Sequence, residues 1–203
     1  MICQSLRMID VLPALALFAF VTSATPGPNN LMVMASGANF GLRRSVPHML
    51  GISAGFVLML VLSGLGLGEI FELYPVSLTI LKVAATVYMI YLAWKIAHAA
   101  PAGKRRAGAQ PMTFLQAAAF QWVNPKAWAM ALTTITVYVA DKGVAMLLLG
   151  GLVFALVNLP AITAWTVLGQ QMARFLTNPA RLRVFNWTMA VLLVASLYPI
   201  LQL

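Results

Sequence analysis

The chain has 203 residues, of which 62% are hydrophobic and only 8% are charged. Soluble domains are usually about 45–50% apolar and about 25% charged, so this composition excludes a water-soluble globular domain. The hydrophobicity also excludes a disordered chain, and the single cysteine, Cys3, excludes a fold held together by disulfides. An integral membrane protein remains, and at about 20 residues per span the chain has room for at most about seven or eight spans.

The chain has 13 basic and 4 acidic residues and a formal net charge of +9. In a soluble protein this excess would favour nucleic-acid binding. Here the charges fall almost entirely between apolar runs, which is typical of residues that set membrane topology. We therefore expect the lipid bilayer as a partner and no nucleic acid.

Six apolar segments follow one another along the chain. They run from about Val11 to Ala35, Val46 to Gly68, Val76 to Ala97, Met112 to Ala140, Gly143 to Gln170 and Val184 to Leu203. Each is long enough to cross a hydrocarbon core of roughly 30 Å, and none alternates polar and apolar residues as a barrel strand would. We predict an all-α polytopic protein with six transmembrane helices, in which residues 1–203 form a single membrane domain.

Basic residues are distributed unevenly between the two sides of the predicted bundle. Nine follow the first, third and fifth segments: Arg43, Arg44, Lys95, Lys104, Arg105, Arg106, Arg174, Arg181 and Arg183. Only Arg7 and Lys142 lie on the other side, together with Glu69 and Glu72. Because cytoplasmic loops carry the excess of Lys and Arg, we expect cytoplasmic basic loops and periplasmic termini. A re-entrant segment would move the N-terminus to the other side.

The first and fourth segments each contain a cluster of helix-breaking residues, at 25–29 and at 124–126, about half the chain apart. Three spans per half is an odd number, so two such halves must insert in opposite orientations. Inverted repeats with broken helices near the midplane recur in secondary transporters. We predict inverted three-helix halves at about 11–97 and 112–203, joined by a basic loop at 98–111, with helices one and four broken.

Two prolines and a glycine form the first break. Pro26 and Pro28 lack a backbone N–H and cannot continue a helix, and Gly27 removes the side-chain restraint. Unpaired backbone groups cost several kcal/mol each in hydrocarbon, so the break needs protein groups or a water-filled cavity around it. Asn29 and Asn30 supply amide groups there. The alternative is a proline kink repaired by neighbouring helices.

Asn124, Pro125 and Lys126 form the second break. Lys126 lies about 14 residues into its segment, which is roughly 21 Å at 1.5 Å per residue. A lysine at that depth is a functional-site hypothesis by default. Since no span interior contains a carboxylate, we expect a substrate carboxylate as its partner. The alternative is that Lys126 binds the carbonyl groups released by the first break.

Other polar and small residues stand out within the apolar segments. Lys82 either anchors its segment at the interface or contributes to the site, and Gln121 either lines a path or bonds between helices. His48 is interpreted as an interfacial residue rather than a proton relay. The G-x-x-x-G patterns at 37–41 and 51–55 predict close helix packing.

The expected site binds substrate and performs no covalent chemistry. Its residues are Thr25, Pro26, Gly27, Pro28, Asn29, Asn30, Lys82, Gln121, Asn124, Pro125 and Lys126. The sequence contains no Cys-x-x-Cys, no metal-ligand spacing and no nucleophile with a nearby base. We therefore expect no catalytic residue, no metal and no cofactor.

The stretch from Ala24 to Asn30, which reads ATPGPNN, resembles the signature of the LysE/RhtB family of amino-acid exporters. Three further stretches agree in order: 37–55, 81–95 with its YLAWK, and 120–126 with its NPK. The resemblance covers nearly the whole chain and implies an inner-membrane exporter of amino acids or their derivatives, driven by the proton gradient. Within the family, Asn30 and the WKIA of 94–97 are most similar to the branch that exports cysteine and O-acetylserine.

We predict a secondary transporter, not an enzyme, that exports a small neutral amino acid or derivative by alternating access. Cysteine, O-acetylserine, threonine and homoserine represent this class. Lys126 and the amides near Gly27 and Asn29 would bind the carboxylate. Asn124 and the carbonyls freed by the two prolines would bind the ammonium group. Association into a homo-oligomer is compatible with the sequence.

Three other classes of protein are alternatives to a transporter of this kind. A membrane-embedded enzyme would need a nucleophile, a metal cluster or a Cys-x-x-Cys. A divalent-cation transporter of related architecture would need acidic or histidine side chains inside the spans. A non-catalytic structural membrane subunit would have no reason for two breaks at mid-membrane.

Overall fold

The computed structural model describes residues 2–67, 73–74, 76–99, 110–139, 143–176 and 178–198, with the backbone alone for residues 2–10 and Leu78. Within these ranges all regular structure is helical, which confirms the all-α prediction. Part of the charge argument lies outside the described residues, because it rests on Glu69, Glu72, Lys142 and residues 104–106.

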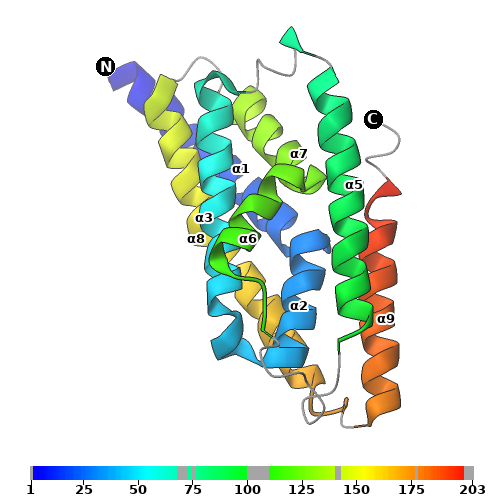
Figure 1. Cartoon of the computed structure of the whole chain (residues 1–203). Helices are drawn as coiled ribbons and strands as arrows, with labels where there is room; N and C mark the ends of the chain where they lie inside the picture. The colour runs from blue at the N-terminus through cyan, green and yellow to red at the C-terminus, as the bar shows by residue number, and fades with distance from the viewer. Residues whose placement is uncertain are drawn as a thin grey trace.

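The helices lie side by side in an elongated bundle (Figure 1). In chain order the elements are α1 (Ile2–Ala24), α2 (Pro28–Phe40), α3 (Leu42–Leu62), η1 (Ser63–Leu67), α5 (Val76–Ala97), α6 (Phe114–Phe120), η3 (Gln121–Val123), α7 (Pro125–Thr133), η4 (Thr134–Val139), α8 (Gly143–Met172) and α9 (Pro179–Ala195). The elements η1 and η4 are π-helical turns that continue α3 and α7, and η3 is a 3₁₀ turn between α6 and α7.

Three described helices are long and apolar enough to cross a membrane: Leu42–Leu67, Thr79–Ala97 and Gly143–Met172. The α1–α2 pair becomes a fourth if it counts as one span bent by 53°. The predicted fourth segment is divided among α6, η3, α7 and η4, and α9 has 17 residues. Length and composition therefore support up to four of the six predicted spans.

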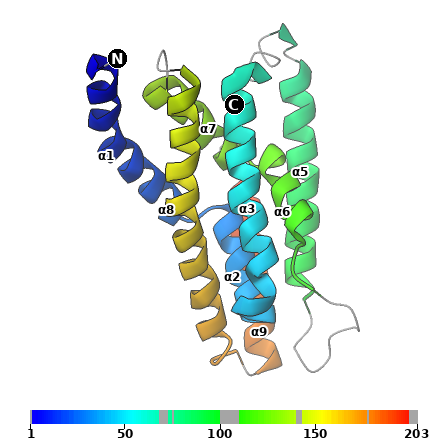
Figure 2. The same cartoon turned by 90° about the vertical axis from the view of Figure 1, so that its left-hand side faces the viewer.

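The bundle has two distinct ends. The α2–α3 junction, the C-terminal end of α5 and the α8–α9 junction lie together at one end, and the N-terminus of α1 lies at the other (Figures 1 and 2). Arg43, Arg44, Lys95, Arg174 and Arg181 belong to the first group of segments. We call this end the basic end.

Apolar side chains fill the bundle and also cover its outside. One core cluster, centred on Met89, Phe120 and Phe185, joins α2, α5 and α9, and another around Phe56 and Phe154 joins α1, α3, α7 and α8. Large hydrophobic side chains are exposed along every long helix, among them Leu17, Leu58, Val87, Leu156 and Val191. An apolar surface of this extent is typical of a protein that contacts lipid.

Small residues allow two pairs of helices to approach closely. A β-carbon at Gly37 of α2 would collide with the Thr166 carbonyl of α8, and one at Gly169 of α8 would collide with the Met34 carbonyl of α2. Gly51 and Gly55 of α3 lie in the same way against the backbone of α6. The predicted packing role of the 51–55 pattern is therefore confirmed.

Candidate functional site

Both predicted helix breaks are present. The helix α1 ends at Ala24 and α2 begins at Pro28, and η3 and α7 meet at Asn124, whose backbone is extended. Pro28 and Pro125 each open the helix that follows. Proline suits a first helical position, because its missing N–H would have no helical partner there. The same residue type therefore ends one helix and starts the next.

Side chains satisfy the carbonyl groups at the end of α1. Trp165 Nε1 donates to the Ala24 carbonyl at 3.1 Å, and Asn30 Nδ2 donates to the carbonyls of Ser23 and Thr25, both at 2.8 Å. The last carbonyls of any helix lack partners within it. These hydrogen bonds explain how the backbone breaks inside an apolar segment without leaving these three carbonyls unpaired.

Lys126 binds the same break from the opposite half of the chain. Its Nζ lies 2.7 Å from the Thr25 carbonyl oxygen, 3.0 Å from Thr25 Oγ1 and 3.4 Å from the Pro26 carbonyl oxygen. An ammonium group has three N–H donors, and three acceptors surround this one. In this conformation Lys126 therefore binds the carbonyl groups released by the first break, which is the alternative to a substrate carboxylate. A substrate carboxylate as its partner stays a prediction.

Gly27 makes room for the Lys126 side chain. A β-carbon built at Gly27 would lie 2.7 Å from Lys126 Cδ and 3.1 Å from Nζ. The Gly27 backbone is extended, with φ −172°, so any residue could adopt its conformation. Glycine is needed at this position because of the lysine rather than because of the backbone.

An amide pair joins the two breaks directly. Asn29 Nδ2 donates to Gln121 Oε1 at 2.8 Å, and Gln121 Nε2 donates back to Asn29 Oδ1 at 3.2 Å. Gln121 also donates to the Ala117 carbonyl and is fully buried. The structure therefore brings the two predicted clusters together, although about 90 residues separate them in sequence.

The cavity between the breaks is small. Its volume is about 20 Å³, and one water needs roughly 10–15 Å³. Its lining residues are Thr22, Ser23, Gly27, Asn29, Asn30, Phe56, Asn124, Lys126, Ala127, Met130 and Asn158. An amino acid does not fit, so this conformation has a closed central site that Lys126 partly fills.

The remaining expected site residues lie in different places. Thr25 and Pro26 supply the oxygen atoms that Lys126 binds, while Pro28 and Pro125 only begin helices. Lys82 is half-buried on α5 and is not among the residues that line the central cavity.

Two residues that stabilise the first break could not be predicted from the sequence. Trp165 stands in an apolar run of α8 with no local signal of a polar role, yet its indole N–H binds the end of α1. Ser23 lies before the motif and carries no signal of a role in the site, yet its carbonyl accepts a hydrogen bond from Asn30. Among the described residues, no three His, Cys, Asp or Glu side chains gather where they could hold a metal ion.

Comparison with known proteins identifies relatives that match most of the chain. The family model described as "LysE type translocator" matches residues 20–196. The cysteine/O-acetylserine efflux proteins of Escherichia coli K12 and of Shigella flexneri are each 28% identical to the chain over 187 residues, which cover 91% of this chain and 94% of theirs. No solved structure matches the chain significantly.

Proposed function

The chain belongs to the LysE-type translocator family, and from that premise we propose that it exports a small neutral amino acid or derivative across the cytoplasmic membrane. Membership in this family makes the chain a transporter and not an enzyme. The relatives named for cysteine and O-acetylserine efflux support a substrate of that size and charge. The lack of acidic residues inside the predicted spans argues against a cationic amino acid.

The contact between Lys126 and the first break is the observation that carries the mechanism. The Thr25 and Pro26 carbonyls already bind one ammonium group, that of Lys126. The ammonium group of an amino acid has the same donors and charge, so it can replace Lys126 at these carbonyls. Lys126 is then free to pair with the substrate carboxylate.

The first turn of α2 supplies further donors for that carboxylate. The opening N–H groups of a helix have no partner within it, and the helix dipole favours negative charge at this end. The backbone N–H of Asn29 lies in this turn, two residues after Gly27. In this proposal the central cavity opens when Lys126 leaves the break, since the closed cavity has no room for an amino acid.

The proposed architecture is two inverted three-helix halves that alternate access around the two breaks. Its support is the position of the breaks, one early in each half, and the amide pair of Asn29 and Gln121 between them. In this proposal α6 to η4 form the fourth span and α9 the sixth. The basic end is cytoplasmic, the termini are periplasmic, and the proton gradient drives export.

The test is efflux of labelled amino acids from cells that overproduce the protein. The panel contains serine, O-acetylserine, cysteine, threonine, homoserine and lysine, with and without a protonophore. We expect export of one or more neutral compounds, abolished by the protonophore, and no export of lysine. Export of lysine alone, or of none of the panel, would contradict the proposed substrate class. An export rate that the protonophore does not lower would contradict proton coupling.

A further inference from the structure

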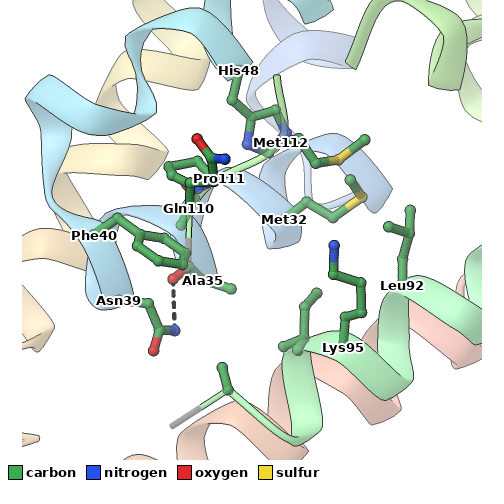
Figure 3. Close-up of a pocket in the computed structure, with 13 residues that line it drawn as sticks. Met32, Ala35, Asn39, Phe40, His48, Leu92, Lys95, Gln110, Pro111 and Met112 are labelled. Atoms are coloured by element: carbon green, nitrogen blue, oxygen red, sulfur yellow. Dashed lines mark hydrogen bonds between the residues drawn. The ribbon is translucent and has the colours of Figure 1, made fainter. Parts of the chain in front are cut away.

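A second cavity lies beside α2 near the basic end. Its walls come from α2 from Met32 onward, the start of α3, the end of α5 and residues 110–112 (Figure 3). Its volume is about 110 Å³, several times the roughly 10–15 Å³ that one water needs. Unlike the central cavity, it has room for a small molecule.

Two buried polar groups on the walls have no partner within the described part of the chain. His48 is 2% exposed, and neither of its ring nitrogens makes a hydrogen bond to any described residue. Asn39 is 6% exposed, and both hydrogens of its amide are donated, to the Ala35 carbonyl and to Asn186 Oδ1. Its Oδ1 accepts none from the described part of the chain. Leaving such groups unpaired costs about 1–3 kcal/mol each, which a ligand with matching groups would recover.

Lys95 supplies the charge of the cavity. Its amine points into the cavity from α5, whereas His48 reaches it from α3 (Figure 3). The Lys95 ammonium lies 5.7 Å from the centre of the Tyr91 ring. Among the described residues that line the cavity, Lys95 is the one cation, and none is Asp or Glu. The site therefore favours a ligand that carries a carboxylate.

We propose that this cavity is a second binding site for the transported amino acid, where it binds before it reaches the central site. The inference rests on the proposed function. The carboxylate pairs with the Lys95 ammonium and the N–H of His48, and the ammonium group donates to Asn39 Oδ1. The apolar surface of Met32 and Met112 contacts the side chain of the ligand. From Asn39 back to Asn29, ten residues of α2 cover about 15 Å, so one helix connects the two sites.

Cysteine protection tests this site in the purified full-length protein. Cys3 is the single native cysteine, so Cys3→Ser gives a cysteine-free background. Ile96→Cys then places a thiol on the cavity wall, and Arg181→Cys places one on the exposed start of α9 as a control. The readout is the labelling rate with a small cationic methanethiosulfonate, with and without O-acetyl-L-serine. Serine, threonine and homoserine are tested in the same way.

We expect a protecting amino acid to slow labelling of Ile96→Cys about tenfold at ten times its dissociation constant and to leave Arg181→Cys unchanged. The methyl ester of that amino acid, which lacks the free carboxylate, should not protect the thiol of Ile96→Cys. Lys95→Met and His48→Phe should abolish protection, whereas His48→Gln, which keeps a donor and an acceptor, should retain part of it. Protection should persist in Lys126→Met, because that residue belongs to the central site.

Two opposite results separate this inference from the proposed function. Export of a neutral amino acid by cells, with no protection by any member of the panel, overturns the second site alone. Protection without any export overturns the proposed function and leaves the cavity as an amino-acid binding site without a role in transport. A third result also overturns the second site: the thiol of Ile96→Cys is still protected in Lys95→Met but is no longer protected in Lys126→Met. The amino acid would then bind at the central site and slow labelling in the second cavity from a distance.

Discussion

Lys126 places a positive charge beside the end of α1, where the carbonyls of a helix C-terminus carry partial negative charge. Its three acceptors are two backbone carbonyls and the Thr25 hydroxyl. A charge inside an apolar segment costs at least about 2.5–3.5 kcal/mol on insertion scales. These dipoles explain how the chain accommodates the lysine when no carboxylate lies in the predicted spans.

Lys126→Met keeps the length of the side chain and removes its charge. We expect this variant to accumulate in the membrane normally but to lose about tenfold or more of its export, which corresponds to about 1.4 kcal/mol. Lys126→Arg should also lose much of it, because a planar guanidinium does not reproduce a compact ammonium. The measurement is efflux normalised to membrane protein level, with Arg183→Met as the control. Near-normal efflux by Lys126→Met would show that the lysine is structural.

Gly27→Ala tests the contact between the break and the lysine. The added methyl group would lie 2.7 Å from Lys126 Cδ, and overpacking of this kind typically costs about 1–3 kcal/mol. We expect lower thermal stability and weaker export. In a Lys126→Ala background the cost should fall by about 1 kcal/mol, because alanine has neither the δ carbon that the methyl group would meet nor an ammonium to displace from the carbonyls. An equal cost in both backgrounds, measured by thermal unfolding of the four proteins, would refute the contact.

At the scale of elements, the two broken segments behave as one unit. The amide pair of Asn29 and Gln121 joins the start of α2 to η3, and Lys126 at the start of α7 binds the end of α1. Prolines begin α2 and α7, so the helices that carry these side chains start at defined positions. We therefore expect a change at one break to affect the other.

Removing one member of the amide pair should cost more than removing both. Asn29→Leu leaves the buried Gln121 amide without this partner, which we expect to lower the free energy of unfolding by about 1–3 kcal/mol. Gln121→Leu should do the same. In the double variant the loss should be less than the sum of the two, because no amide is left unpaired. Additive losses in thermal or denaturant unfolding would show that the pair does not couple the breaks.

At the scale of the whole molecule, charge divides the bundle into two ends. The α2–α3 junction, the end of α5 and the α8–α9 junction lie at the basic end, opposite the N-terminus of α1 (Figure 2). Nine of the basic residues belong to the loops and helix ends expected on that side, against two on the other. The second cavity also opens near the basic end, so a cytoplasmic basic end would let it receive substrate from the cytoplasm.

Fusions to a reporter that is active only in the periplasm test this orientation. Because Lys and Arg are enriched in cytoplasmic loops, a fusion after residue 106 should be inactive. A fusion after residue 142, on the opposite side, should be active, and immunoblots of both fusions control for expression. Strong periplasmic activity after residue 106 would reverse the orientation and, with it, the assignment of the second cavity to the cytoplasmic side.

The sequence alone determined the features that depend on local chemistry. Apolar runs without alternation specify helices, and the prolines at 26, 28 and 125 end one helix and start the next wherever the segment lies. The small residues at 51 and 55 predicted a close helix contact, which α6 provides. The family followed from a short motif, ATPGPNN, together with the order of three others.

Only the tertiary structure decided which groups face one another. Lys126 meets the Thr25 carbonyl 101 residues away, and Trp165 meets Ala24 across 141 residues. His48, interpreted from its position as an interfacial residue, is buried on a cavity wall. Such contacts depend on how remote helices pack, because backbone carbonyls are present at every residue and their partners cannot be read from local sequence. For the same reason, local sequence does not indicate that the central site is closed while a larger cavity lies beside α2.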